Sequence, residues 1–284
     1  MKRLLGIAVV LSAGVIVAAD QDNLPDPVKP DFETPRPIEA VDSVFIKDLT
    51  WMEVRDAMRD GKTTVIVATG GIEQNGPYLI ADKHNVVLRG TTEALARKLG
   101  NALVAPIIPF VPEGDINPPT SHMKYPSTIS VSEDTYQRLV TDVCESLRSH
   151  GFKHVLLIGD SGDNQAGLKA VAEKLNAQND PNRGHVHYIA EYYNFPEVAK
   201  YLEEHGVNQK PEGLHDDFGM TAMMMAVDPQ SVRMNQRIAA GKFHIIGGNR
   251  MPVPNTSAWG ERLIEFRADA AVEAIKKSIA AAEK

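Results

Sequence analysis

The fold is decided by residues 63–77, TTVIVATGGIEQNGP, in which a β-branched apolar run leads directly into a glycine-containing polar segment. The run over residues 63–69 is apolar almost throughout instead of alternating between apolar and polar side chains. Such a run is typical of a parallel strand that is buried on both faces of its sheet. We therefore expect a strand over 63–69 that carries the polar side chains after it to one edge of a parallel sheet.

Strand and helix patterns alternate on both sides of this run. Thr50 and Glu53 have the spacing of a capping box, which predicts a helix that ends before Gly61. The other expected strands cover residues 102–108, 153–158 and 185–190, and the expected helices cover 50–59, 91–99, 132–150, 165–177, 221–227 and 261–282. This alternation predicts a single α/β domain over residues 44–284, with a mostly parallel central sheet flanked by helices.

The first 43 residues have a different character. Lys2 and Arg3 precede an apolar run over residues 4–17, and small residues follow it up to Ala19. This pattern predicts a signal peptide over residues 1–19 and a periplasmic or secreted protein, with an uncleaved N-terminal anchor as the alternative. The run is too short for a good spanning helix, so we expect no membrane association after cleavage. Residues 20–43 are rich in Pro and Asp and predict an extended arm.

The charge of the chain excludes one class of partner. The formal net charge is −7, and removal of Lys2 and Arg3 with the signal peptide takes away two positive charges and leaves −9. An acidic chain is unsuited to binding nucleic acid through its phosphates, so we expect a small-molecule substrate and no nucleic acid. Cys144 is the single cysteine of the sequence. No intramolecular disulfide can therefore form.

Three polar segments are the places to look for chemistry. Residues 70–85 and 159–164 each follow an expected strand, and residues 213–217 lead into a Met-rich helix. Ligands of parallel sheets bind at the carboxyl ends of the strands. Carboxylates and imidazoles from such segments suit divalent ions such as Zn²⁺ and Mn²⁺. The alternative for each segment taken alone is a set of turn-capping or solvated side chains.

Taken together and in order, the polar segments resemble the creatininase family of metal-dependent amidohydrolases. Residues 73–79, EQNGPYL, are similar to that family's Glu-Gln-His-Gly-Pro-His-Leu, and residues 125–130, YPSTIS, to its Phe-Pro-Gly-Thr-Ile-Ser. A His-Gly-Phe turn at 150–152 leads to residues 159–164, GDSGDN, which are similar to its Asn-Gly-His-Gly-Gly-Asn loop. The resemblance covers roughly residues 45–280. It implies a three-layer creatininase-like α/β fold.

The resemblance also implies a metal site, although several ligands differ. Glu73 matches the family's glutamate ligand, whereas Asn75 replaces a histidine and His84 an aspartate. Asp160 is placed opposite the loop histidine, and Met220 stands where the family has a late glutamate. We expect one Zn²⁺ or Mn²⁺ ion held by Glu73, His84 and Asp160, with Asn75 as a weak carbonyl ligand.

The family's activity then suggests roles for the remaining polar residues. His215, together with His122, is expected to protonate the leaving nitrogen, because an imidazole titrates near neutral pH. Asp217 is expected to orient His215. The sequence thus predicts hydrolysis of a C–N bond in a small cyclic or linear amide by a homo-oligomer, which the resemblance makes a hexamer. The alternative is a non-catalytic protein that binds a small ligand on a degenerate creatininase scaffold.

Overall fold

The computed structural model describes residues 30–178, 180, 183–210, 212–213, 215–246 and 253–283. Residues 40–284 form one compact unit. Residues 30–39, taken separately, consist of turns and bends. The expected signal peptide over 1–19 and the first part of the arm lie outside the described residues, so both stay predictions. Within the described part of the chain, no helix has the length and apolar character needed to cross a membrane.

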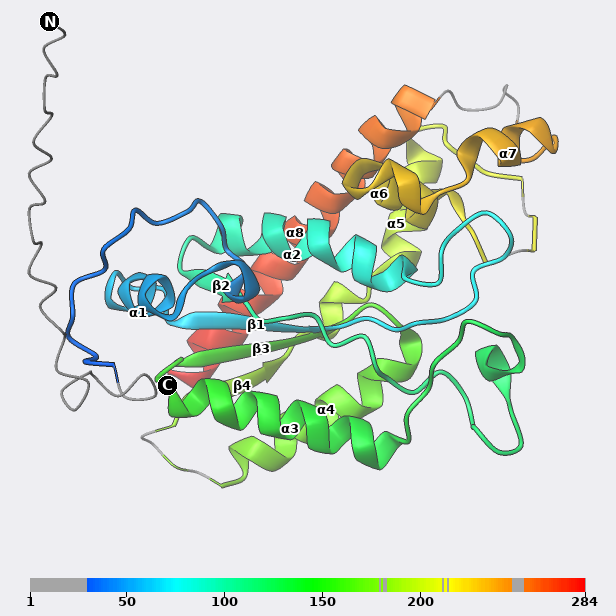
Figure 1. Cartoon of the computed structure of the whole chain (residues 1–284). Coiled ribbons are helices and arrows are strands. Elements are labelled where there is room, and N and C mark those ends of the chain that lie inside the picture. The colour runs from blue at the N-terminus through cyan, green and yellow to red at the C-terminus, as the bar shows by residue number, and fades with distance from the viewer. Residues whose placement is uncertain are drawn as a thin grey trace, which may run out of the picture. The chain divides into compact units, whose positions relative to one another are not determined.

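The centre of the compact unit is a parallel sheet of four strands (Figure 1). The strands are β1 (Thr64–Thr69), β2 (Ala102–Val104), β3 (His154–Gly159) and β4 (His185–Tyr188). Their order across the sheet is β2-β1-β3-β4, and each neighbouring pair is parallel. Because Thr69 pairs with Gly159, the chain leaves β1 and β3 at the same edge of the sheet. The prediction of a mostly parallel sheet flanked by helices is confirmed.

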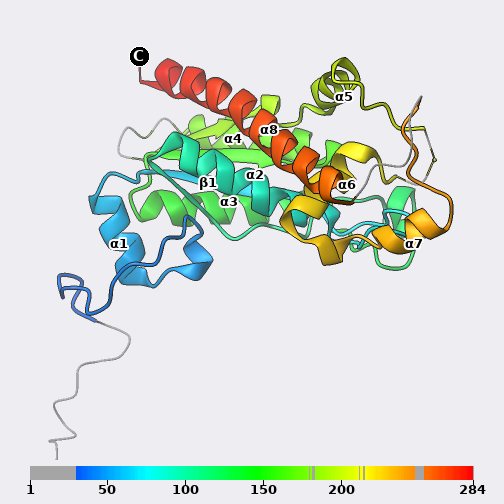
Figure 2. The ribbon, with the colours of Figure 1, turned by 90° about the horizontal axis from the view of Figure 1, so that it is seen from above.

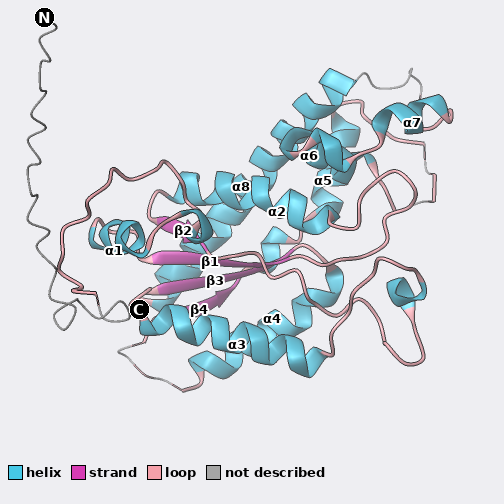
Figure 3. Cartoon of the chain, in the orientation of Figure 1, coloured by secondary structure: helices cyan, strands magenta, loops and turns pink. Residues whose placement is uncertain are grey.

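Helices cover both faces of the sheet (Figures 1 and 2). The helices are α1 (Trp51–Arg59), α2 (Lys83–Leu99), α3 (Glu133–Ser149), α4 (Gln165–Asn176), α5 (Phe195–Glu204), α6 (Phe218–Val227), α7 (Met234–Ala239) and α8 (Val253–Ala282). Helices α3 and α4 pack on one face, and α2 and α8 pack on the other. Figure 3 shows the resulting three layers of helix, strand and helix.

The apolar run of β1 supplies both halves of the core. Val65 and Val67 pack with the residues of α3 and α4, whereas Ile66 and Ala68 pack with those of α2 and α8. Successive side chains of a strand point to opposite faces, so both sets must be apolar when both faces are covered. Each fully buried valine or isoleucine contributes roughly 1.5–3 kcal/mol relative to an exposed one. This two-sided burial explains why the run shows no alternation.

The helix-start signals that were expected from the sequence are present. The Thr50 side chain accepts a hydrogen bond from the Glu53 amide, and the Glu53 carboxylate accepts one from the Thr50 amide. Helix α3 begins directly after Ser132, whose hydroxyl accepts a hydrogen bond from the Thr135 amide. Such caps typically contribute about 1 kcal/mol each.

Other bounds differ from the prediction. Helix α2 begins at Lys83, eight residues before the expected start at 91. The polar residues at its beginning suggested a loop, but in the structure they are buried. Strand β2 ends at Val104, ahead of Pro106, which lacks the amide hydrogen that a ladder needs. Helices α5 and α7 were not expected from the sequence.

Candidate metal centre

A polar cavity of about 370 Å³ lies at the carboxyl end of the sheet. Its lining comes from the segments after β1 and β3, the first turn of α2, the segment over residues 113–122, and the residues at the beginning of α5 and α6. This is the edge at which parallel sheets bind their ligands. The cavity therefore lies where the sequence predicted chemistry.

Hydrogen bonds between segments hold the cavity in shape. The amide nitrogen of the Asn164 side chain donates to the carbonyl oxygens of Thr69 (3.0 Å) and Gly70 (2.9 Å), which joins the loops after β3 and β1. The Ile129 amide donates to the Ile72 carbonyl at 2.9 Å. Two of the motif segments that are far apart in the sequence are thus fixed beside each other.

Glu73, His122 and His215 converge in this cavity. One potential ligand atom from each lies within 4.8 Å of the other two. Glu73 Oε2 is 3.2 Å from His122 Nε2, and Glu73 Oε1 is 3.6 Å from His215 Nδ1. Two ligand atoms on one tetrahedral zinc ion are about 3.3 Å apart, because each bond is about 2.0–2.1 Å long. The spacing of Glu73 Oε2 and His122 is close to this value, and a nitrogen of His215 lies within 4.8 Å of both residues' ligand atoms, so the three residues could hold one ion.

The donor set of these three residues also fits a metal. Two imidazoles and one carboxylate form the ligand set of several catalytic zinc sites, which keep a further position open for water or substrate. The His215 side chain is 44% exposed and that of His122 is 24% exposed, whereas Glu73 is buried. One side of the triad is therefore accessible from solvent.

Next to the triad, buried ion pairs form a continuous network. The His84 ring lies between two carboxylates, with Nε2 2.9 Å from Glu73 Oε1 and Nδ1 2.8 Å from Asp160 Oδ2. Asp160 Oδ1 is 2.8 Å from the Arg267 guanidinium, and Glu73 Oε1 is 2.8 Å from the Lys83 ammonium. All five side chains are at most 7% exposed. The network thus alternates buried cations and anions.

This alternation sets the charge of each group. Burial alone would lower the pKa of His84, but its hydrogen bonds to Asp160 and Glu73 outweigh burial and raise that pKa. Burial would raise the pKa of Asp160, yet the charge of Arg267 and the hydrogen bond from His84 lower it. The pKa of Glu73 is lowered in the same way, against burial, by His84 and Lys83. Both ring nitrogens of His84 face carboxylates, and these shifts favour two anions with a protonated imidazole between them.

The predicted ligands thus meet, but as partners in ion pairs. Glu73, His84 and Asp160 lie together on one side of the sheet, as expected. A doubly protonated imidazole has no lone pair for a metal. The Asn75 side chain donates to the carbonyl oxygens of Glu73 (2.9 Å) and Ile80 (3.1 Å), and it acts as a clamp on the backbone. The set Glu73, His84, Asp160 and Asn75 stays a prediction, and the fit to a metal is better at the triad.

The assignment of Asp160 to the family's loop histidine needs a correction of one residue. When the six residues of Asn-Gly-His-Gly-Gly-Asn are matched in order to residues 159–164, Ser161 stands opposite the histidine. Asp160 stands opposite the glycine before it. Position 84 has a histidine where the family has an aspartate. The carboxylate that faces this histidine comes from Asp160, one residue before the position of the family's loop histidine.

The expected catalytic residues lie at the same cavity. The rings of His122 and His215 have centroids 4.9 Å apart, and Asp217 lines the cavity wall. Asp217 Oδ1 accepts a hydrogen bond from the Met220 amide at 3.0 Å and caps α6. Among the described residues, no hydrogen bond or ion pair joins Asp217 to His215. The orienting role of Asp217 stays a prediction.

Sequence reasoning missed three charged residues of the site, Lys83, Glu113 and Arg267. Glu113 is 1% exposed, and neither of its carboxyl oxygens has a hydrogen-bond donor among the described residues. Burial, together with the charge of Glu73, raises the pKa of Glu113 to about 8. A side chain on Gly71 would collide with Glu113 Oε1, so this glycine makes room for the buried carboxyl group.

One sequence signal was available for Arg267. It stands among Leu263, Ala268 and Ala271 on the buried face of α8. An arginine on the apolar face of a helix needs a buried anion as its partner. The sequence does not say that this anion is Asp160, more than 100 residues earlier.

Comparisons with known proteins point to one family. The family model for creatininase, described as creatinine amidohydrolase, matches residues 47–275. A creatinine amidohydrolase of Pseudomonas putida is 24% identical over 122 residues, which is 43% of this chain and 46% of that relative. The match thus spans less than half of the relative's length.

Solved structures show the same fold. A mutant creatininase is similar with a TM-score of 0.61 and 19% identity, over 83% of this chain and 98% of that chain. A mutant creatininase in a Zn–Zn form is similar with a TM-score of 0.60 and 18% identity, over 84% and 98% of the two chains.

Proposed function

Because the chain belongs to the creatininase family, we propose that it is a metal-dependent hydrolase that cleaves a C–N bond in a small cyclic or linear amide. The family supports hydrolysis of an amide in general terms. The substrate can differ from the creatinine in the relative's name, because the residues around the site differ from the family's motifs at 75, 84 and 161.

The observation that carries the proposal is the convergence of Glu73, His122 and His215 in a solvent-accessible polar cavity. A divalent ion in such a site polarises a carbonyl group and lowers the pKa of water. Lys83 and His84 hold the Glu73 carboxylate ionised and fixed in direction before any ligand arrives. The protein therefore presents a pre-oriented anionic ligand, which catalytic sites require.

The two imidazoles have a changed role in this proposal. His122 and His215 serve as ligands, although the sequence suggested that they transfer protons. Burial and the charge of Lys83 lower the pKa of His215, so its ring is neutral at pH 7, as a ligand must be. Asp163 and Asp217 line the same cavity and are placed to exchange a proton with the substrate.

We further propose one ion per chain in place of two. A solved relative is described as a Zn–Zn form. Here the Lys83 ammonium is 2.8 Å and the His84 ring 2.9 Å from Glu73 Oε1, so two protein cations already face that oxygen. Like charges at such distances repel strongly in a buried site. A second ion beside Glu73 Oε1 would have to displace these cations.

The same network supports a second candidate, a non-catalytic protein that binds a small polar ligand. Glu73 and Asp160 are already neutralised by Lys83, His84 and Arg267, so the fold has no electrostatic need for a metal. In this case the polar cavity of about 370 Å³ would be the ligand site.

Metal analysis separates the two candidates. Protein purified without chelators should contain close to one divalent ion per chain, and Zn²⁺ or Mn²⁺ should raise its melting temperature. His122→Gln should lose the ion, whereas the exposed control His150→Gln should retain it. Absence of bound metal, with a melting temperature that Zn²⁺ and Mn²⁺ leave unchanged, would favour the binding protein.

We also propose that the protein is exported and forms a homo-oligomer. The pattern over residues 1–19 supports cleavage after Ala19 and a periplasmic or secreted location. N-terminal sequencing of the mature protein would test the cleavage. Light scattering would test the proposed homo-oligomer, for which the expected size is a hexamer.

A further inference from the structure

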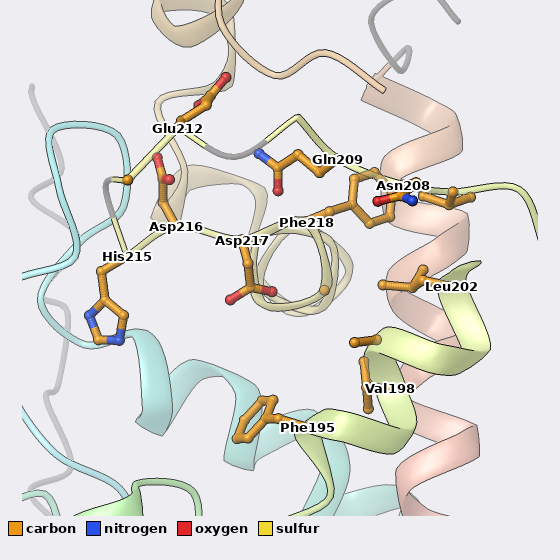
Figure 4. Close-up of a pocket in the computed structure, with 14 residues that line it drawn as sticks. Phe195, Val198, Leu202, Asn208, Gln209, Glu212, His215, Asp216, Asp217 and Phe218 are labelled. Atoms are coloured by element: carbon orange, nitrogen blue, oxygen red, sulfur yellow. The ribbon is translucent and has the colours of Figure 1, made fainter. Parts of the chain in front are cut away.

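A second cavity, of about 510 Å³, adjoins the polar one. It is enclosed by α5, the beginning of α6 and the segment between them, and Figure 4 shows its lining. Val198 and Leu202 of α5 face Phe218 of α6, and Val207 completes an apolar wall. A cavity of this size and character is typical of sites that bind small organic molecules.

The two cavities share part of their walls. Phe195, His215 and Asp217 line both of them. Figure 4 shows His215 on one side of the larger cavity and Val198 and Leu202 on the opposite side. A molecule with one end at the triad would reach the apolar wall of α5 by passing His215 and Phe195.

Two of the three carboxylates at the wall of this cavity, Glu212 and Asp216, are paired with a buried cation. The Arg237 guanidinium is 2.9 Å from Glu212 Oε2 and 3.1 Å from Asp216 Oδ2. Arg237 is 0% exposed, so its charge is directed to these two partners and not to a ligand. The third, Asp217, lies at the border with the polar cavity and caps α6 through its Oδ1. The most accessible apolar side chains of the lining are Phe195 and Ala199 of α5, which lie over the buried Val198, Leu202 and Phe218.

We propose that this cavity binds an apolar part of the substrate, an aliphatic chain or an aromatic ring attached to the amide that is hydrolysed. This inference rests on the proposed function, which places the amide at Glu73, His122 and His215. The substrate class is then a hydrophobic amide. Small polar amides fill only the polar cavity and leave the larger one without a ligand.

A series of linear amides measures the contribution of the cavity. We expect kcat/KM of the zinc-loaded protein to rise from acetamide through butanamide and hexanamide to octanamide. The rise should be about fourfold per methylene group, until the chain fills the cavity. The same amides should bind the metal-free protein with affinities that rise in the same order, as measured by calorimetry.

Two variants locate the effect. Ala199 is an exposed residue of α5 that lines the cavity, and Ala199→Trp should fill it and flatten the dependence on chain length in both measurements. Val198→Thr keeps the shape of the wall but replaces a methyl group with a hydroxyl group, and it should weaken the dependence. The control Ala281→Trp, at an exposed position of α8, should leave the dependence unchanged.

The outcomes distinguish this inference from the proposed function. Binding that rises with chain length and is blocked by Ala199→Trp, without hydrolysis, supports the apolar site and contradicts the enzyme. Hydrolysis at a rate that is independent of chain length supports the enzyme and overturns the apolar site. A dependence that survives Ala199→Trp also overturns it, because the chain would then bind elsewhere.

Discussion

Two buried histidines at opposite ends of the sheet have opposite properties. His84, at the carboxyl end, lies between the carboxylates of Glu73 and Asp160, and its pKa is raised. His187, on β4, lies near the amino ends of the strands, with Nε2 3.2 Å from His154 Nδ1. Its ring centroid is 4.6 Å from that of His185. Burial, together with these two histidines, lowers the pKa of His187 to about 3.

Burial does not explain the difference, because His84 is 6% and His187 is 2% exposed. Desolvation disfavours the charged form of both rings, and the neighbours then decide the outcome. His84 has two anionic partners and is charged, whereas His187 donates to or accepts from His154 and the Ser278 hydroxyl and is neutral. The site end of the sheet is therefore built from compensated charges, and the opposite end from neutral rings.

The largest expected effect comes from breaking the charged network. Asp160→Asn should destabilise the protein by about 3–5 kcal/mol, because Arg267 and His84 would be left buried without their shared anion. Urea unfolding measures the loss. The control Asp134→Asn removes the exposed partner of Arg138 and should cost about 0–1 kcal/mol. Equal losses in the two variants would mean that the network is not held by charge.

The second effect is a dependence of stability on pH that His187 causes. Its folded pKa of about 3 lies below the ordinary value of 6.5, so only the unfolded chain takes up a proton between these values. Stability is then full above pH 6.5 and falls towards pH 3, by up to about 1.4 kcal/mol per pH unit. In urea unfolding between pH 6 and 5, this slope should be smaller in His187→Gln.

His84 should behave in the opposite sense. Its raised pKa means that its contribution is full below pH 6.5 and is lost as pH rises through the folded pKa. For the His187→Gln experiment, the control is His150→Gln at an exposed position, which should keep the pH slope of the wild type. An unchanged slope in His187→Gln would show that this ring is not the neutral group described above.

The third effect concerns the metal itself. Lys83→Met should tighten the binding of Zn²⁺ by about tenfold or more, because a positive charge 2.8 Å from Glu73 Oε1 is removed. Competition with a chelating dye measures the affinity. Lys169→Met, which removes an exposed lysine of α4, should leave it unchanged. Weaker binding in Lys83→Met would indicate that the ammonium orients Glu73 more than it repels the ion.

The smallest effect sharpens the comparison at the neutral end. His185→Gln removes one of the two imidazoles that lower the pKa of His187, so that pKa should rise. It should stay below 6.5, because burial is the larger cause and remains. Titration of the ring by nuclear magnetic resonance measures it. A rise to 6.5 or above would show that neighbouring charge, and not burial, keeps the ring neutral.

The sequence predicted the strands of the sheet better than the segments at its carboxyl end. The apolar run at β1 and the capping residues Thr50 and Ser132 are local signals, and the structure agrees with them. The beginning of α2 was missed because residues 82–85 are polar and were taken for a loop. Their partners are Glu73, Asp160 and the backbone of Gly71, and only the folded chain brings these close.

For the site too, the sequence did not reveal which distant residues meet in the folded chain. The order of motifs drew attention to Glu73, His122 and His215, but the choice of ligands followed positions in the motifs. Whether a histidine can bind a metal depends on which other side chains contact it in the folded protein. His84 meets two carboxylates and is charged, and no pattern in the sequence marks Arg267 as the residue that anchors one of them.

The most direct test is a crystal structure of the zinc-loaded protein with anomalous scattering data measured at the zinc edge. We predict one peak per chain, about 2.0–2.2 Å from the Glu73 carboxylate and from one nitrogen each of His122 and His215. His84 should remain between Glu73 and Asp160. A peak coordinated by His84 and Asp160, or no peak at the triad, would contradict it.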